Sequence, residues 1–570
     1  MEAGKRYIRD IFSGSMRLEI PFFQRSYVWG EPQWERFLDD AETVCASDES
    51  YFMGSLILKQ KPTNSASSVG NVRTVVDGQQ RLTTLSVLMK VLSLKTGSTR
   101  SFDRQFILID DTPALLHNRN DEAAYNRIMK LESLDDLEGA DGITRLYRYF
   151  KDKVDPEKLN FDKICNLIYF VGIDLSFDED EQQIFDTINS LGVRLTTAEL
   201  LKNYFFGRND IASYEENWVE IFEKDEETRA YWDQVVTSGS TKRTFLDLLF
   251  YSFLLVKVQE NSYGVTAEDK TRYSRVEQLF GSYKSFIEKY AGGDRSAILR
   301  DIREYAVVFR KAISFDVLTE ELASQAGIDR INVIMFALDT STLLPYVLFI
   351  EKNVEDEKTR NEIYDYLEAY VMRRLVTRQN TKNYYHLFSD KLILNRVLTR
   401  EDLVRALADG DDTNSRMPAN EEVVQAFHES RLTNKYAKGA LYLIESRIRD
   451  RNMHSTSLLG IDKYSLEHLM PKKWRNNWTF AGTTAEEEKR DQILLTLGNL
   501  TIITQALNAS IRDADWATKR FGKGEKGGLL KYAEGIETIY EYLNGDVWDE
   551  KSIYKRAEDL AAKALEVWKV

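Results

Sequence analysis

A glutamate followed by a histidine, Glu467 and His468, stands near the C-terminus in a strand-like run that Pro471 ends. An enzyme that cuts phosphodiesters needs a hard divalent cation held by oxygen ligands, and a base that deprotonates the attacking water. Glu467 and Asn508 can supply those oxygens, and neutral His468 can be the base. Adjacent strand residues point to opposite faces, so the pair shares one site only if the strand ends or bends there, which Pro471 permits. Taken alone, such a pair is most often a surface ion pair.

The small numbers of histidines and cysteines limit the kinds of metal site that the chain can form. Only five histidines occur, at positions 117, 386, 428, 454 and 468, which argues against a His-rich zinc or di-metal site. Cys45 and Cys165 have no Cys-x-x-Cys neighbour, which excludes zinc ribbons, disulfide scaffolds and thioredoxin chemistry. We expect both cysteines to pack as small apolar residues.

A second group of hydrogen-bond donors lies at residues 77–84, where an Asp-Gly turn opens a helix. Such a turn exposes unpaired N–H groups and the positive end of the helix dipole, which together favour an anion. The segment that would hold phosphate oxygens contains Asp77, Gly78, Gln79, Gln80, Arg81, Thr83 and Thr84. Gln24 and Arg25 would add contacts from a separate segment. There is no Walker A sequence, so the site is not a P-loop.

Aromatic residues close to Gln24 leave two interpretations of this region open. Tyr27 and Trp29 offer faces on which a base can stack. In the structural interpretation, Asp77 only caps a helix, Arg25 pairs with an acid, and these rings belong to the core together with Phe22 and Phe23.

The elements that position these residues differ along the chain. Residues 52–60 and 73–76 predict a hairpin with a long loop, residues 167–175 a strand, and residues 181–189 and 197–206 helices. Strand and helix alternate, so residues 1–210 are expected to form an α/β or α+β domain. Helical spacing at residues 244–258, 276–290, 301–313 and 361–375 predicts a helical middle domain, residues 211–415. Linker composition at residues 410–420 then leads to a third domain, residues 416–570.

The charge balance bears on nucleic acid. The chain has 570 residues and a net charge of −14, so it is not an obvious non-specific binder of nucleic acid. Binding depends on a local basic footprint. Residues 507–531 carry six basic residues against three acidic ones, and Lys472, Lys473 and Arg475 form a shorter basic step. A solvated helix face would look the same. Arg373 and Arg374 in the middle domain either follow a DNA backbone or pair with acids.

Hydropathy argues against a membrane. The mean hydropathy is −0.42, and no window offers the roughly 18 uncharged apolar residues that a spanning helix needs. The first twelve residues have neither the apolar core nor the cleavage site of a secretory signal. A cytoplasmic protein that does not contact a membrane is the expectation.

The C-terminal residues resemble a known motif. Residues 467–471, then Leu-Gly-Asn-Leu-Thr at 497–501, then Asn508 and Lys519, resemble the His-Asn-His (HNH, ββα-metal) nuclease motif of the GmrSD family of modification-dependent, type IV restriction enzymes. The resemblance implies that Glu467 and Asn508 are metal ligands, His468 is the general base, Asn499 props the loop between the strands, and Lys519 faces phosphate. Glu467 stands where Asp is commoner, and about thirty residues separate His468 from Asn499.

The N-terminal residues resemble the other half of the same family. The signature comprises residues 20–29, 51–56 and 77–84, completed by a piece from Ile184 to Asn203. The resemblance implies a ParB/sulfiredoxin-like domain that binds or hydrolyses nucleoside triphosphates and senses modified DNA.

These inferences predict an α+β multidomain, mainly helical chain with a ParB/sulfiredoxin-like α/β domain, a helical middle and a C-terminal ββα-metal HNH nuclease domain. The predicted function is an NTP-regulated DNA endonuclease that nicks or cleaves modified phage DNA in antiphage defence. It would use Mg²⁺ or Mn²⁺, and GTP, ATP or CTP. Two alternatives stay open: a ParB-like nucleotide-dependent DNA-binding switch without cleavage, and an RNA-targeting abortive-infection nuclease. Assembly as a homo-oligomer is left open.

Overall fold

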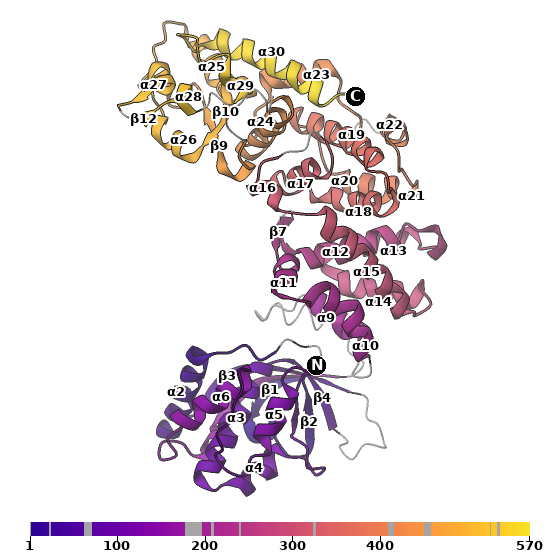
Figure 1. Ribbon diagram of the computed structural model, residues 1–570, viewed down its shortest axis with the longest axis vertical. Helices are drawn as coiled ribbons and strands as arrows, with labels where there is room; N and C mark the ends of the chain where they lie inside the picture. The colour runs from indigo at the N-terminus through magenta and orange to yellow at the C-terminus, as the bar shows by residue number, and fades with distance from the viewer. Residues whose placement is uncertain are drawn as a thin grey trace. The chain divides into compact units, whose positions relative to one another are not determined.

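The structure is a computed structural model. It describes residues 2–21, 24, 26–61, 71–176, 197–206, 210–238, 241–322, 326–408, 415–449, 458–524, 526–532 and 536–570. The predicted helix at residues 181–189, most of the signature piece that ends at Asn203, and Arg25 lie outside these residues. The chain forms two compact units, Met1–Glu215 and Glu216–Val570, which are described separately (Figure 1).

The first unit is built on a six-stranded mixed sheet with the strand order β1-β6-β3-β4-β2-β5. Its strands are β1 Glu2–Tyr7, β2 Met16–Glu19, β3 Tyr51–Gln60, β4 Asn71–Asp77, β5 Leu115–Leu116 and β6 Ile168–Leu175. β3 and β4 pair antiparallel with Lys59 opposite Thr74, and β3 runs parallel to β6. The predicted hairpin and the strand at residues 167–175 are therefore confirmed. β1 was not predicted, because an edge strand with charged residues shows no apolar alternation.

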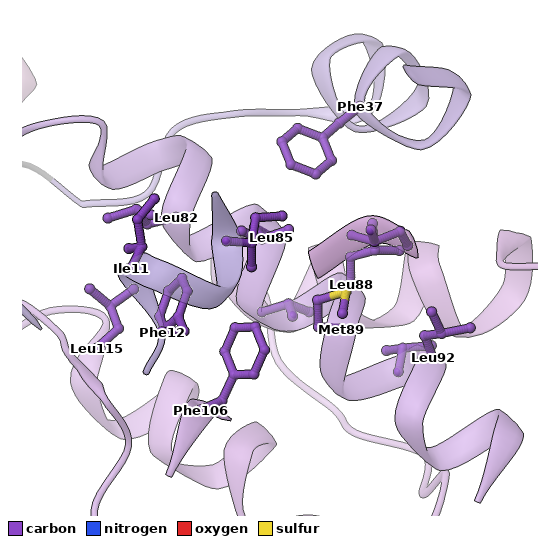
Figure 2. Close-up of a cluster of buried hydrophobic side chains, with 14 of the residues drawn as sticks. Ile11, Phe12, Phe37, Leu82, Leu85, Leu88, Met89, Leu92, Phe106 and Leu115 are labelled. Atoms are coloured by element: carbon purple, nitrogen blue, oxygen red, sulfur yellow. The ribbon is translucent and has the colours of Figure 1, made fainter. Parts of the chain in front are cut away.

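The core of this unit lies between the sheet and its helices. The described helices are α1 Ile8–Ile11, α2 Glu31–Ser47, α3 Gln79–Thr96, α4 Thr99–Phe106, α5 Glu122–Met129, α6 Gly142–Lys153, α7 Phe161–Leu167, α9 Thr197–Phe205 and α10 Ile211–Tyr214. Figure 2 shows Leu82, Leu85 and Leu88 of α3 among side chains from other elements, including Phe37 and Phe106. α3 is buried on nearly all sides, so it presents no polar stripe to solvent. Full burial of each leucine contributes about 1.5–3 kcal/mol.

The second unit is mainly helical. Its longer helices are α11 Glu226–Trp232, α12 Phe245–Lys257, α13 Ala267–Tyr273, α14 Leu279–Lys289, α15 Arg295–Ala312, α17 Ile328–Ala337, α18 Leu344–Asn353, α19 Glu357–Val376, α22 Arg400–Ala408, α23 Asn420–Glu429, α24 Asn434–Ile448, α25 Thr484–Ile493, α26 Gln505–Ile511, α27 Trp516–Phe521 and α30 Glu550–Val567. The predicted helical segments correspond to α12, α14, α15 and α19. Short antiparallel pairs are β7 Val235–Ser238 with β8 Thr241–Thr244, β9 Tyr464–His468 with β10 Leu500–Thr504, and β11 Gly522–Lys523 with β12 Lys526–Gly527.

Buried arginines join the predicted middle and last domains into this one unit. Arg330 of α17 forms an ion pair with Glu368 of α19 at 2.6 Å, and its Nη2 also donates to the Leu443 carbonyl of α24. Arg373 donates from Nε to the Trp568 carbonyl at 2.8 Å. Arg374 donates to the backbone carbonyls of residues 416 and 380. Both arginines of α19 therefore hold the chain's own backbone. They are buried, so the predicted role of following a DNA backbone describes neither of them.

Candidate functional site

Glu467 and His468 come from the strand β9 of the second unit, and Asn508 comes from the helix α26. β9 and β10 pair antiparallel, with Thr501 opposite Glu467, and α26 follows β10 directly. Thr504 caps α26 by accepting a hydrogen bond from the Leu507 N–H. In chain order, α25 lies between the two strands and α26 follows them, and α26 contacts both strands.

Asn499 holds the loop that follows β9. Its Nδ2 donates to the carbonyls of Met470, at 2.8 Å, and Leu494, at 3.0 Å. Its Oδ1 accepts from the Met470 N–H at 2.8 Å and from the Trp548 indole at 3.0 Å. The Asn499 side chain is fully buried, and both its amide nitrogen and its amide oxygen are hydrogen-bonded. Its partner Met470 lies two residues after His468. That Asn499 holds this loop as part of a nuclease site, as the family resemblance implies, stays a prediction.

Glu467 forms a buried ion pair with Lys519 of α27, and the Lys519 ammonium also donates to the His468 carbonyl at 2.7 Å. Burial raises the pKa of Glu467 and lowers that of Lys519, while their mutual attraction opposes both shifts. The structure contradicts the prediction that Lys519 faces phosphate, because the Lys519 side chain is wholly enclosed. A carboxylate buried beside β9 needs an opposite charge, and Lys519 supplies it.

His468 is the last residue of β9 and is half-buried. Burial, followed by the charges of Lys472 and Lys519, lowers its pKa to about 4. The ring is therefore neutral at pH 7 and can accept a proton. A phosphate beside the ring would raise this pKa towards neutrality.

Asn508 lies over the face of β9 that carries Glu467. Its Nδ2 donates to Ser465 Oγ at 3.0 Å and to the Leu466 carbonyl at 3.1 Å. Ser465 and Glu467 are two residues apart on the strand and so point to the same face. With the amide nitrogen held in this way, the Asn508 side-chain oxygen is left for another partner. No donor to it is found among the described residues.

The donor chemistry of these residues fits Mg²⁺ or Mn²⁺ in part. Glu467 and Asn508 offer a carboxylate and an amide oxygen, and Mg²⁺ commonly takes one or two protein oxygens, with water and substrate phosphate completing its shell. Within the described ranges, no cluster of three or more His, Cys, Asp or Glu side chains is arranged to hold a metal ion. A cation here would thus depend on the substrate for several of its ligands.

Asp513 is a carboxylate near this site that the sequence analysis missed. Its charge adds to the rise that burial causes in the pKa of Glu467, and it opposes the lowering that burial causes in the pKa of Lys519. It follows Arg512, whose φ of +33° is unusual for a residue other than glycine. The sequence feature that could have identified Asp513 is its position, five residues after Asn508 and just beyond the end of α26.

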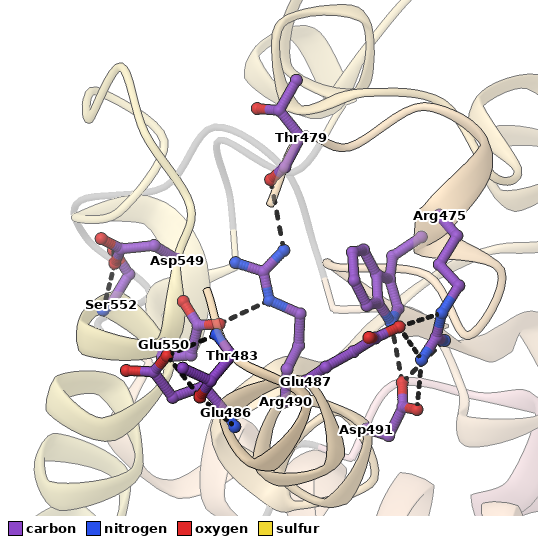
Figure 3. A network of polar contacts seen from close by, with 11 residues as sticks. Arg475, Thr479, Thr483, Glu486, Glu487, Arg490, Asp491, Asp549, Glu550 and Ser552 are labelled. Atoms are coloured by element: carbon purple, nitrogen blue, oxygen red, sulfur yellow. Dashed lines mark hydrogen bonds and ion pairs between the residues drawn. The ribbon is translucent and has the colours of Figure 1, made fainter. Parts of the chain in front are cut away.

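One residue of the shorter basic step, Arg475, forms ion pairs within the protein. Figure 3 shows Arg475 against Glu487 and Asp491, with nitrogen to oxygen distances of 2.6 and 2.8 Å. The same network ties Arg490 to Glu550 and caps α25 through Thr483. Lys472 and Lys473 remain exposed beside it.

In the first unit, the three signature segments that the structure describes meet around one pocket of about 420 Å³. Such a volume is within the range of small-molecule sites. Trp29 comes from the first segment, Tyr51, Phe52 and Gly54 from the second, and Arg81 from the third, with Arg36 and Asp40 of α2 completing a mixed aromatic and charged lining.

Gly54 allows Arg81 to lie in this pocket. A Cβ at position 54 would stand 2.0 Å from Arg81 Nη1, and Gly54 has a φ of +127°. The register of β3 against β6 shifts between Phe52 and Gly54, as at a β-bulge. Arg81 Nη2 also contacts Asp77 Oδ2 at 2.9 Å. The predicted cap by Asp77 is wrong, because Gly78 is the N-cap of α3 and Asp77 ends β4.

The other predicted phosphate donors of α3 point inward. The hydroxyls of Thr83 and Thr84 donate to the carbonyls of Gln79 and Gln80, both at 2.8 Å. Thr83 also contacts His117 at 2.8 Å. The side chains of Gln79, Gln80, Thr83 and Thr84 are all buried, and their contacts with phosphate oxygens stay a prediction. Hydroxyls that bond one turn back in this way can sit in an apolar interior.

The same helix start tethers the segment at residues 26–29. Gln80 Oε1 accepts from the Val28 N–H at 2.9 Å, and the Tyr27 hydroxyl contacts Thr84 Oγ1 at 2.5 Å. Tyr27 is therefore a core residue, whereas Trp29 lines the pocket. Gln24 is half-buried and its N–H donates to Pro21, outside the pocket lining.

Comparison with known families matches both ends of the chain. Residues 8–206 are similar to the GmrSD restriction endonuclease N-terminal domain, and residues 417–563 to the GmrSD restriction endonuclease C-terminal domain. Together these matches cover more than half of the chain. A search of curated proteins finds no match. Each helix in the described part of the chain is too short or too polar to cross a lipid bilayer.

Proposed function

The chain belongs to the GmrSD family of restriction endonucleases, and on that premise we propose that it is an NTP-regulated, divalent-metal-dependent DNA endonuclease of the ββα-metal type. Its target would be modified phage DNA. The observation that supports the proposal is the packing of α26 on β9: Asn508 of α26 bonds to Ser465, on the β9 face that also carries Glu467, and β9 ends at His468.

In this proposal the residues divide the chemistry. Neutral His468 takes the proton from the attacking water, and its lowered pKa keeps it in the accepting form at neutral pH. Glu467 and Asn508 would hold Mg²⁺ or Mn²⁺, which when bound stabilises charge on the phosphate. Asn499 fixes the loop after β9 and thereby the position of His468.

The pocket of the first unit supports nucleotide binding. Arg81 can donate charge-assisted hydrogen bonds to a phosphate, and Trp29, Tyr51 and Phe52 offer aromatic surface for a base. Regulation would then be a coupling between nucleotide and DNA. Since coupling in binding free energy is reciprocal, modified DNA should change NTP affinity by the factor by which NTP changes DNA affinity.

The test is plasmid cleavage by the full chain with Mg²⁺, Mn²⁺ or EDTA, with and without each NTP, on unmodified, glucosylated and phosphorothioated DNA. We expect cleavage only with a divalent cation and a change in rate with NTP. Glu467→Gln and Asn508→Ala should raise the metal concentration that gives half-maximal cleavage, which separates metal ligands from merely structural residues.

Each alternative gives a different result. Full cleavage in EDTA contradicts metal dependence, and rates that no NTP changes contradict the regulatory role of the first unit. DNA binding that depends on nucleotide, without any cleavage, identifies a ParB-like switch. Cleavage of tRNA in preference to every plasmid identifies an RNA-targeting nuclease.

A further inference from the structure

The basic run at residues 507–531 divides into a buried and an exposed part. Lys519 is enclosed against Glu467, and Arg520 donates to the Leu543 carbonyl at 2.7 Å and contacts Asp546 at 3.1 Å. Both charges are therefore used within the fold. Three nearby residues are exposed: Phe521, which is 62% exposed, and Lys523 and Lys526 on the strands β11 and β12.

β11 and β12 form a hairpin held firmly against α27. Gly522 has a φ of +89°, and a Cβ there would stand 1.9 Å from the Lys526 carbonyl oxygen. At Gly528, a Cβ would meet the backbone oxygens of Lys519 and Arg520, each at 2.5 Å. Only glycine permits such approaches, so the two exposed lysines project from a defined backbone.

Two like charges face each other across this hairpin, with Glu525 between them in the sequence. Lys523 and Lys526 are direct partners in the β11 and β12 register, and like charges opposite one another are destabilising. Neither lysine forms an ion pair with any described acidic side chain, in a chain with a net charge of −14. A polyanion bound across both lysines would relieve this repulsion.

Phe521 adds an aromatic surface beside the two lysines. The Arg520 guanidinium lies 4.8 Å from the centre of its ring, and the internal contacts of Arg520 hold that guanidinium in place. The ring is thus supported by a fixed cation while most of it faces solvent. An exposed ring next to basic side chains is the combination that stacks on nucleic-acid bases.

The hairpin adjoins the candidate catalytic residues. α26, which carries Asn508, contacts β9 and β11, and Lys519 lies only two residues before Phe521 on α27. β11 therefore packs against the same helix as β9, the strand that carries Glu467 and His468.

We propose that the hairpin of β11 and β12 is a DNA contact that presents the strand to be cut, with Lys523 and Lys526 on backbone phosphates and Phe521 stacked on a base. This inference rests on the proposed DNA endonuclease function. It goes further because it assigns substrate contacts to residues outside the candidate catalytic group. It also distinguishes the lysines, which would contact phosphates, from Phe521, which would contact a base.

The test measures the affinity of the full chain for a fluorescent DNA duplex in EDTA over a range of salt concentrations. The double variant Lys523→Ala/Lys526→Ala should reduce the slope of log K against log salt by about 2, the value for two lost phosphate contacts. The matched control is Lys551→Ala/Lys555→Ala, which removes two exposed lysines from α30 of the same unit. Its slope should stay that of the unchanged protein.

Phe521 has a different expected signature. Phe521→Ala should weaken DNA binding about tenfold, the scale for one stacked base, with no change in the salt slope. Phe521→Trp should retain affinity because it keeps an aromatic face. Equal unfolding midpoints for all variants establish that the hairpin changes have not disturbed the fold.

The outcomes separate this inference from the proposed function. If the unchanged protein binds and cuts DNA while the lysine and phenylalanine variants behave like it, the hairpin inference is wrong and the endonuclease stands. If no form of DNA is bound or cut, both are wrong. If tRNA binds more tightly than DNA and shows both signatures, the hairpin is an RNA contact and the inference is overturned.

Discussion

Each candidate site contains an acidic and a basic side chain in contact, but the two pairs lie in different surroundings. The side chains of Arg81 and Asp77 in the first unit are 19% and 21% exposed. Those of Lys519 and Glu467 in the second unit are 0% and 8% exposed. A pair at the solvent edge contributes about 0–1 kcal/mol, whereas removing one partner of a buried pair costs about 3–5 kcal/mol.

This difference separates two residues for which the sequence predicts the same role. Arg81 can exchange Asp77 for the phosphate of a ligand at little cost. Lys519 cannot leave Glu467 without stranding a buried charge, so its role is to position Glu467 and the end of β9. Burial, which depends on tertiary packing, decides which basic residue is free to bind.

The largest expected effect is on stability, at the buried pair. Lys519→Met should lower the free energy of unfolding by about 3–5 kcal/mol, because Glu467 is then buried without its partner. Urea denaturation followed by circular dichroism measures this. Glu467→Met/Lys519→Met should recover most of the loss, since neither charge remains. The control Lys523→Met, on an exposed residue, should change stability by less than about 0.5 kcal/mol. A Lys519→Met variant as stable as the unchanged protein would contradict the enclosed arrangement.

The next effect is on cleavage. His468→Ala should lower the rate about 10²-fold or more, the scale for loss of a general base, while fold and DNA binding persist. His386 provides the control, because its side chain is 74% exposed and lies in α20 Tyr384–His386. His386→Ala should cut at the normal rate. Plasmid nicking with Mg²⁺ or Mn²⁺ is the measurement, and undiminished cleavage by His468→Ala would remove the residue from the site.

Local patterns in the sequence predicted helices and strands better than they predicted the directions of individual side chains. The hairpin of β3 and β4 and the helix α19 were predictable, because turn residues and apolar spacing are properties of short segments. The edge strand β1 was not, because its residues carry no apolar alternation. The signature segments indicated a site that includes Trp29 and Arg81. That Gly54 and the bulge in β3 make room for Arg81 could be seen only in the structure.

The directions of side chains could not be predicted where contacts between residues far apart in the sequence determine them. Thr83 and Thr84 lie in a helix that is buried on nearly every side, and nothing in the sequence shows which face meets the pocket. Lys519 meets Glu467 across 52 positions of the chain, so its inward direction depends on the docking of α27 against β9. Arg373 likewise binds a carbonyl at the far C-terminus.

A smaller effect is expected at the exposed pair of the first unit. Arg81→Ala should weaken the binding of the preferred nucleotide about tenfold, because a charge-assisted hydrogen bond to phosphate is lost. Titration calorimetry with GTP, ATP and CTP measures it. Asp77→Asn keeps Arg81 and weakens its internal competitor, so affinity should stay equal or increase. Unchanged affinity in Arg81→Ala would return residues 77–84 to the role of a structural helix start.

The smallest effect should come from Thr83→Val, which tests whether the inward arrangement of α3 persists when nucleotide binds. The Thr83 hydroxyl is buried and bonded to the Gln79 carbonyl and to His117, so it has no route to a ligand in the pocket. The substitution should cost about 0.5–1.5 kcal/mol of stability from the lost hydrogen bonds. At a temperature where the variant is fully folded, nucleotide affinity measured by calorimetry should stay within about twofold. A loss as large as that of Arg81→Ala would mean that the start of α3 rearranges on binding and that its hydroxyls reach the phosphates.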